Sequence, residues 1–275
     1  MTTAVLLIVL LAALLHALWN ALVKTSADRA ITLGLVAMGH CLPAFALLPF
    51  VPVPAIEAFA FIIASTVIHW GYYYFLNISY RLGDLSLIYP IARGTAPVMV
   101  AFGAMIWADE TLPVWAWIGI LTISAGVMIL AAIRHADKRG VGAALATSAI
   151  IAAYSVVDGI GIRVSDTPIG YVVWLFAAEV FVAVFVIGTR FERARSISQR
   201  SFAVGLTGGV ISGLAYALAL FAKTLAPIGV VSAVRETSVI FAALIGVYWL
   251  GEGPARRRLV AASVVALGVI ILALS

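Results

Sequence analysis

Residues 90–110 read PIARGTAPVMVAFGAMIWADE, and residues 232–252 read SAVRETSVIFAALIGVYWLGE. Each stretch is a mostly apolar run with one arginine, Arg93 or Arg235, and each ends in a tryptophan and a glutamate at the same spacing. An apolar run of about 20 residues is long enough to cross a bilayer core of about 30 Å as one helix. The two stretches therefore predict related membrane-spanning helices, each with a charge held at lipid depth.

The composition of the whole chain agrees with a membrane protein. Its 275 residues are 64% hydrophobic and only 11% charged, and the mean hydropathy is +1.14. Soluble domains are about 45–50% apolar and about 25% charged, so this composition excludes a water-soluble fold, a disordered chain and a collagen. The single cysteine, Cys41, cannot form an internal disulfide. No basic patch interleaved with aromatic residues suggests nucleic-acid binding.

Long apolar runs with short polar connections predict an all-α membrane protein of ten transmembrane helices. Helices are expected rather than barrel strands, because the apolar runs are continuous and lipid tolerates no unpaired backbone. The predicted spans are residues 4–24, 31–51, 56–80, 85–106, 112–133, 141–162, 169–189, 202–222, 227–250 and 257–274. The first is expected to be a span and not a signal peptide, since no basic region precedes it and no cleavage site follows it.

Basic residues divide unequally between the two sets of connections. The connections after the first, third, fifth, seventh and ninth spans hold 13 of the 17 Lys and Arg residues. The other set holds only Arg163 and Lys223, and Arg93 and Arg235 lie inside spans. The positive-inside rule then predicts a multi-pass plasma (inner) membrane protein with the basic connections in the cytoplasm and both termini outside.

An internal repeat divides the chain into two units of five spans. Residues 77–133 match residues 219–275 without a gap, which predicts one unit over 1–135 and a second over 140–275. An odd number of spans makes the second unit enter the membrane from the opposite side. Equivalent connections carry opposite basic loads, as such an inversion requires. Inverted repeats are typical of secondary transporters, whose substrate lies near the midplane between the halves.

One set of residues carries a family resemblance. It comprises Tyr80, Gly83, Ser86, Pro90, Pro97, Trp107 to Glu110, Trp117, Gly119, Gly126-Val127, Glu252, Gly268-Val269 and the opening segment from His16 to Lys24. This pattern resembles the EamA family of the drug/metabolite transporter superfamily over nearly the whole chain. The resemblance implies alternating access without ATP hydrolysis, and it leaves the substrate open. The second half lacks prolines matching Pro90 and Pro97, so a functional helix break in the fourth span need not recur in the ninth.

The two intramembrane arginines are the strongest candidates for substrate binding. Arginine at the centre of a spanning helix costs about 2.5–3.5 kcal/mol, so such a residue usually faces a cavity or a partner. A guanidinium suits bidentate capture of a carboxylate or a phosphate-like group. The alternative is a structural ion pair with an intramembrane acid. Glu236 directly follows Arg235 in sequence and is expected to point about 100° away from it, toward another helix.

Other polar residues within the spans complete the candidate site. Glu179 is expected to counter an arginine, bind an amine or carry a proton, and His69 is a second candidate for proton coupling. An aromatic stripe on the third span is expected to line a polar path or to hold a cation, with an interfacial belt as the alternative. The predicted substrate-binding residues are Arg93, Arg235, Glu179, His69, Tyr73, Tyr89, Asn77, Trp19 and Tyr154.

The remaining features are interpreted as structural. Gly205, Gly209 and Gly213 recur every four residues, which is typical of close helix packing. Asp158 is expected at the membrane interface. His40 beside Cys41 is expected to pack, and no metal or other cofactor is expected, because no cluster has ligand spacing. Glu110 and Glu252 precede predicted spans and are expected to cap helix ends.

The predicted function is a secondary active transporter for a small polar metabolite. Paired arginines favour an anionic or zwitterionic substrate such as an amino acid, an organic acid or a phosphonate-like compound. The alternative is an amine or quaternary ammonium compound held by aromatic residues and Glu179. A membrane enzyme or a scaffold is a distant third, since no Walker, HExxH or GxSxG sequence is present. The expected partners are a small-molecule substrate, protons and membrane lipids, and no nucleic acid, for a monomer or homodimer.

Overall fold

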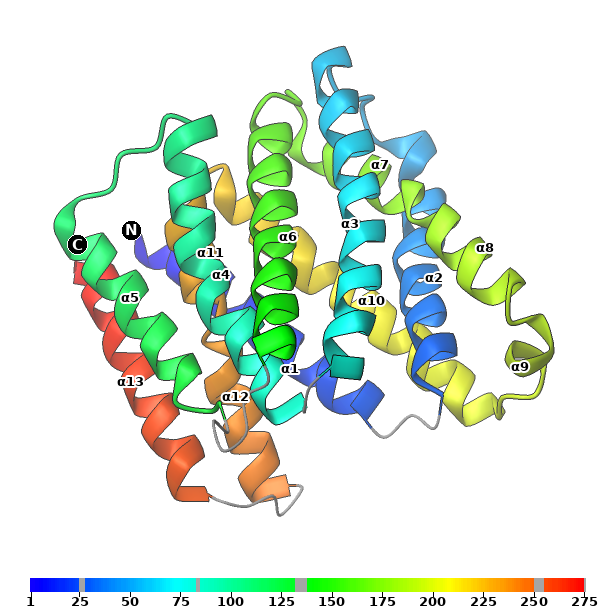
Figure 1. Cartoon of the computed structure of the whole chain (residues 1–275). Coiled ribbons are helices and arrows are strands. Elements are labelled where there is room, and N and C mark those ends of the chain that lie inside the picture. The colour runs from blue at the N-terminus through cyan, green and yellow to red at the C-terminus, as the bar shows by residue number, and fades with distance from the viewer. Residues whose placement is uncertain (25–27, 83–84, 132–137, 250–254, 275) are drawn as a thin grey trace.

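The computed structural model describes residues 1–24, 28–82, 85–131, 138–249 and 255–274, and within them every regular element is helical (Figure 1). The first half of the chain forms α1 (Thr3–Lys24), α2 (Arg29–Leu47), a 3-10 turn (Leu48–Phe50), α3 (Ile56–Leu82), α4 (Leu85–Trp107) and α5 (Val114–Met128). These helices follow the first five predicted spans closely.

The second half has more elements, because two predicted spans are interrupted. It forms α6 (Lys138–Arg163), α7 (Pro168–Ala178), α8 (Val180–Gly188), α9 (Phe191–Arg195), α10 (Gln199–Lys223), α11 (Ile228–Arg235), α12 (Ser238–Leu244), a π-helical turn (Ile245–Trp249) and α13 (Ala255–Leu274). Helix α9 lies in the connection between α8 and α10.

Six described segments are long and apolar enough to cross a membrane. They are Thr3–Val23, Ala30–Phe50, Lys138–Arg163, Pro168–Gly188, Gln199–Lys223 and Arg256–Leu274, and two shorter apolar helices cover Ile56–Tyr72 and Val114–Met128. The protein is therefore helical and multi-pass. The count of ten spans and the division into two units stay predictions.

Both interruptions occur at an acidic residue in the middle of a predicted span. At Glu179 the N–H bonds to the Phe176 carbonyl, and at Glu236 it bonds to the Ala233 carbonyl, so each helix tightens locally from i→i−4 to i→i−3 bonding. Helix α4 is continuous despite Pro90 and Pro97. The break thus lies in the ninth predicted span and not in the proline-containing fourth.

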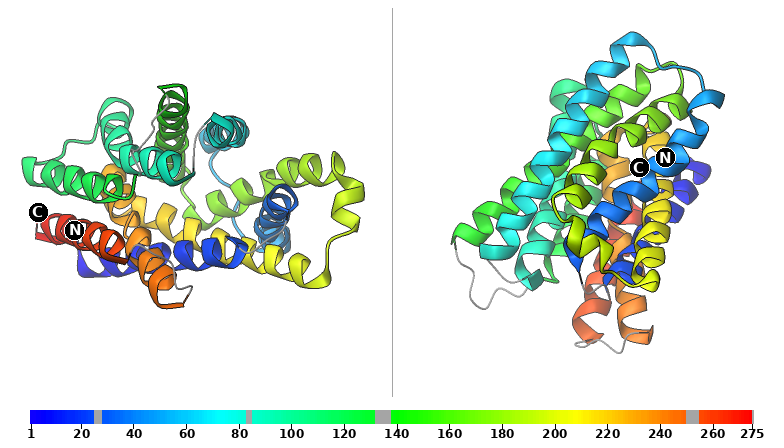
Figure 2. Two further views of the ribbon diagram at one scale, coloured as in Figure 1. Left: turned by 60° about the horizontal axis from the view of Figure 1, so that its bottom comes forward. Right: turned by 90° about the vertical axis from the view of Figure 1, so that its right-hand side faces the viewer.

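The two halves of the chain interlock, and three pairs of helices at corresponding positions in the halves pack against each other. The contacts that a Cβ would make at Gly119 (with Leu272) and Gly126 (with Val265) show that α5 and α13 run antiparallel. Helices α4 and α11 also pack antiparallel, as do α2 and α8. The two termini lie close together in every view (Figures 1 and 2).

Apolar side chains cover much of the outer surface, and several charged side chains lie inside. Exposed positions include Leu7, Ile63, Ile106, Trp115 and Phe181, whereas the buried polar set includes Arg93, Asp158, Lys223 and Glu236. A soluble protein buries large apolar residues and rarely buries charged ones unless they are paired. This reversed arrangement matches a molecule surrounded by lipid.

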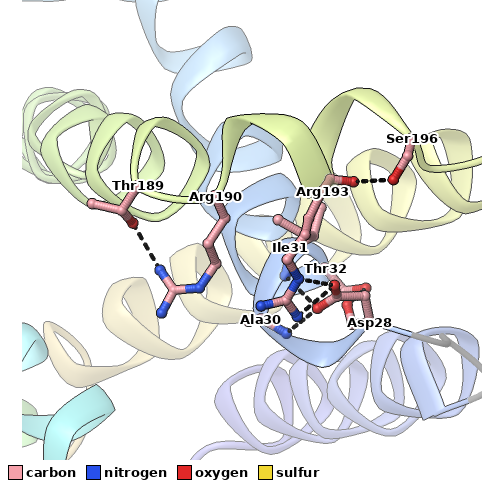
Figure 3. A network of polar contacts seen from close by, with 8 residues as sticks. All are labelled: Asp28, Ala30, Ile31, Thr32, Thr189, Arg190, Arg193 and Ser196. Atoms are coloured by element: carbon pink, nitrogen blue, oxygen red, sulfur yellow. Dashed lines mark hydrogen bonds and ion pairs between the residues drawn. The ribbon is translucent and has the colours of Figure 1, made fainter.

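Asp28 joins two connections at one end of the bundle. One carboxylate oxygen accepts hydrogen bonds from the N–H groups of Ala30 and Ile31, at 3.1 and 3.2 Å, and caps α2. The other oxygen accepts two hydrogen bonds from Arg193, at 3.0 and 2.7 Å (Figure 3). Burial alone would raise the pKa of Asp28, but the hydrogen bonds from Ile31 and Arg193 lower it below its usual value.

Glu110 joins three connections, all of them assigned by the sequence to the opposite side of the membrane. Its Oε1 accepts hydrogen bonds from Arg163, at 2.7 Å, and from the N–H of Ile228 at the start of α11, at 2.8 Å. Arg163 also donates to the carbonyls of Lys223 and Ala226. The expected structural role of Glu110 agrees with this geometry, although the helix it caps is α11 and not α5. The equivalent Glu252 lies outside the described residues.

Candidate functional site

Arg93 of α4 forms a buried ion pair with Glu236, which lies at the interruption between α11 and α12. The guanidinium donates two hydrogen bonds to the carboxylate, at 2.7 and 3.2 Å. Arg93 is only 8% exposed and Glu236 only 4%. The two residues come from different halves of the chain, so the pair holds the halves together inside the bundle. Arg93 thus has the acidic partner that the sequence offered as an alternative to substrate contact.

Arg235 differs from Arg93 because it has no acidic partner among the described residues. Its guanidinium lies over the ring of Tyr216, with the Cζ atom 5.2 Å from the ring centroid. Its Nε is buried and makes no hydrogen bond within the described part of the chain. A cation–π contact compensates a desolvated guanidinium only in part. Glu236 cancels one of the two arginine charges, which leaves one positive charge here.

A small recess brings both arginines and Glu236 together. It lies between α4, α6 and α11, which pack on one another near the centre of Figure 1. Its empty volume is about 260 Å³. The lining residues are Arg93, Arg235, Glu236, Ser155, Ser232, Ala96, Pro97, Val100 and Ile151. Charged groups, two hydroxyls and an apolar wall from both halves of the chain therefore converge on one space.

An aromatic cluster leads from α3 toward Arg235. His69 stacks on Tyr154 of α6, with ring centroids 4.4 Å apart, and both rings meet the edge or face of Tyr216. The Nδ1 of His69 is 2.8 Å from the carbonyl of Ser65 in the preceding turn. The structure thus brings His69 and Tyr154 next to the aromatic ring that carries Arg235.

Asp158 is fully buried next to this cluster and is not interfacial as expected. One carboxylate oxygen accepts a hydrogen bond from the Tyr171 hydroxyl, at 3.0 Å, and the other accepts one from the Tyr216 hydroxyl, at 2.5 Å. Lys223, assigned by the sequence to a connection, is 1% exposed and donates to the Ser155 carbonyl at 2.8 Å. The sequence signal for both residues was a charge within two turns of the end of an apolar run.

Glu179 lies in a separate cluster with His40. Its carboxylate is 2.6 Å from the Nδ1 of His40, whose ring stacks on Phe176. The sequence treated His40 as a packing residue and offered an arginine as the partner of Glu179. Both clusters follow one rule: an acid at a helix interruption of the second half pairs with a basic side chain of the first half.

The other predicted site residues are placed as follows. The indole N–H of Trp19 donates to Nδ1 of His16 at 3.2 Å, and Tyr89 is 37% exposed one turn before Arg93. The side chains of Tyr73 and Asn77 lie outside the described part of the structure. Neither Trp19 nor Tyr89 lines the recess.

The three glycines of α10 lie along α2. A Cβ at Gly205 would meet Leu35, one at Gly209 would meet the Val36 carbonyl, and one at Gly213 would meet His40. The backbones of α2 and α10 are therefore in close contact at Gly209. This contact aligns the helix that carries Tyr216 with the helix that carries His40.

These features define a helical integral membrane protein with a charged recess between its two halves. The EamA-like transporter family model matches residues 138–274, and the chain belongs to this family. Its class is therefore that of membrane transporters of the drug/metabolite type, and not that of enzymes. A solved structure described as "Crystal structure of protein" is similar over 100% of this chain and 99% of its own, with a TM-score of 0.76 and 18% identity, which shows the fold alone. Among curated proteins, none matches the chain.

Proposed function

We propose that the protein is a secondary active transporter that moves a small anionic or zwitterionic metabolite by alternating access. The observation that carries this proposal is Arg235, a buried guanidinium that lines the recess without an acidic partner among the described residues. A carboxylate or phosphonate-like group there would complete its hydrogen bonds and cancel the remaining positive charge. Ser155 and Ser232 add hydroxyls, and the recess suits a small solute.

Several contacts support an inverted arrangement of the two halves in the plasma membrane. The pairs α4/α11, α5/α13 and α2/α8 join corresponding helices of the halves, and each pair runs antiparallel. In addition, Asp28 contacts Arg193, and Glu110 contacts Arg163, so each contact joins connections assigned by sequence to one side. We assign the Asp28 side to the cytoplasm, since the basic connections lie there. Substrate would then bind between the halves.

An amine or quaternary ammonium substrate is less favoured. Such a cation needs an aromatic face and a free carboxylate. The face of Tyr216 is already covered by Arg235, and Glu179 is engaged by His40. The added positive charge would also meet Arg235 in a site that holds one positive charge already.

Thermal-shift screening of purified protein followed by uptake into proteoliposomes tests the proposal. The panel contains amino acids, organic acids, phosphonates and quaternary amines. We expect stabilisation by an anionic or zwitterionic member, and loss of both its stabilisation and its uptake in Arg235→Met. Arg190→Met, at an exposed connection, is the matched control. Stabilisation by quaternary amines alone, or full uptake of the anion by Arg235→Met, would reject the anion site.

A further inference from the structure

Lys223 is a buried amine that neither the ion pairs nor the recess uses. It ends α10, yet its side chain turns inward, and its Nζ donates to the Ser155 carbonyl at 2.8 Å. An ammonium carries three N–H donors. Within the described residues this is the only hydrogen bond of Lys223, so its charge is poorly compensated. A buried amine in this position can exist with or without its proton.

Two residues connect Lys223 to the recess. Ser155 lines the recess, and its backbone carbonyl accepts the hydrogen bond from Lys223. Tyr216 supports Arg235 with its ring and donates its hydroxyl to Asp158, the carboxylate nearest in sequence to Ser155 on α6. The amine, the carboxylate and the unpaired guanidinium therefore belong to one buried cluster.

The charge balance of this cluster depends on the proton of Lys223. Arg93 and Glu236 cancel, so the variable charges are Arg235, Asp158 and Lys223. With a neutral amine the cluster has no net charge, and with an ammonium it carries one positive charge. An anion at Arg235 reverses the preference, because the ammonium then neutralises the cluster. In a low-dielectric interior such charges interact strongly.

The other titratable groups around α10 do not disturb this balance. Arg163 and Glu110 act on Lys223 electrostatically, but they form an ion pair with each other. On α2, His40 pairs with Glu179. Tyr171 of α7 donates to Asp158. On α1, His16 accepts the indole N–H of Trp19.

We propose that Lys223 is the proton-coupling site of the transporter, protonated when an anion occupies Arg235 and neutral when the recess is empty. The proposal rests on the proposed function, and it assigns coupling to a residue different from Glu179 or His69. In the binding step the amine lone pair takes a proton from hydronium and leaves water, and no other covalent bond changes. Anion and proton would then be carried together.

Proton uptake on anion binding is a direct test. Methanesulfonate is a suitable probe because it stays a monoanion across the experiment and takes up no proton itself. Added to purified protein in weakly buffered detergent solution at about pH 8, it should cause proton uptake that a pH indicator dye detects. From about pH 6 to pH 9, its dissociation constant should rise by roughly 5- to 150-fold, the usual range for coupled sites.

Variants identify the group that takes the proton. Lys223→Met should abolish the proton uptake and the pH dependence. Lys223→Arg keeps a permanent charge, so it should bind the probe with little pH dependence and no uptake. Lys138→Met, at the exposed start of α6, is the matched control and should behave as wild type. Thermal unfolding of each variant checks that it is folded.

The outcomes separate the inference from the function on which it rests. If methanesulfonate binds through Arg235 but wild type takes up no proton, the coupling role is overturned and the anion site stands. Proton uptake that persists in Lys223→Met has the same meaning. If Arg235→Met binds the probe as tightly as wild type, the anion site itself is rejected, and the coupling with it.

Discussion

Two arginines at equivalent positions of the repeat have different electrostatic roles. Arg93 is neutralised by Glu236, whereas Arg235, the residue next to that acid, stays unneutralised over Tyr216. Consecutive residues on a helix point about 100° apart, so the acid reaches α4 while the arginine faces α10. The repeat therefore produces one structural arginine and one that is available to a ligand.

Replacing Glu236 by glutamine should destabilise the protein strongly. The change leaves the Arg93 guanidinium buried without its counter-charge, which costs about 3–5 kcal/mol in comparable buried pairs. Thermal or denaturant unfolding in detergent measures the loss. Glu192→Gln, in exposed α9, should unfold as wild type, and Arg93→Met with Glu236→Leu should recover much of the loss. Equal stability of Glu236→Gln and wild type would show that the pair contributes little.

The sequence predicted which arginines lie in the membrane but not what each one contacts. Their depth follows from their position in an apolar run. Their partners depend on how α4, α6, α10 and α11 cross, which no local pattern encodes. Asp158 and Lys223 were misplaced for a related reason. A charge near the end of an apolar run can turn outward to the interface or inward to a partner, and only the packing of other helices decides between them.

At the scale of elements, the interruptions at Glu179 and Glu236 coincide with the intramembrane acids. Hydropathy predicted continuous spans there, since the flanking residues are uniformly apolar and lack Gly or Pro. Prolines, the usual sign of a kink, marked α4, which is continuous. The positions of most helices were thus predictable from apolar length, while local changes of helix type were not, because they depend on contacts with the other half.

The contact between α2 and α10 should be sensitive to a single methyl group. A Cβ at Gly209 would lie well inside van der Waals contact with the Val36 carbonyl oxygen, so Gly209→Ala must separate the two backbones. Overpacking of this kind costs about 1–3 kcal/mol, which should appear as a lower midpoint of thermal unfolding. Gly208→Ala is the matched control, because its Cβ would meet only Val23, at 3.5 Å. A wild-type midpoint for Gly209→Ala would disprove the tight contact.

At the scale of the whole molecule, the proposed orientation can be tested by labelling. In a variant with Cys41 replaced by alanine, one cysteine is introduced at Glu192 or at Thr111. Both positions are exposed and lie in connections assigned to opposite sides. A membrane-impermeant maleimide should label Thr111→Cys in intact cells and label Glu192→Cys only after the membrane is opened. The reverse pattern would invert the proposed topology.

The uninterrupted α4 and the interrupted α11 and α12 make the two halves unequal in backbone shape. A transporter built from inverted halves changes its open side when each half takes up the conformation of the other. Here Pro90 and Pro97 face Ser232 and Val239 in the repeat, so neither half can copy its counterpart fully. The inward-open and outward-open forms are then not mirror images and must differ in free energy. An empty carrier would rest mainly on one side, which would give transport a built-in directional bias.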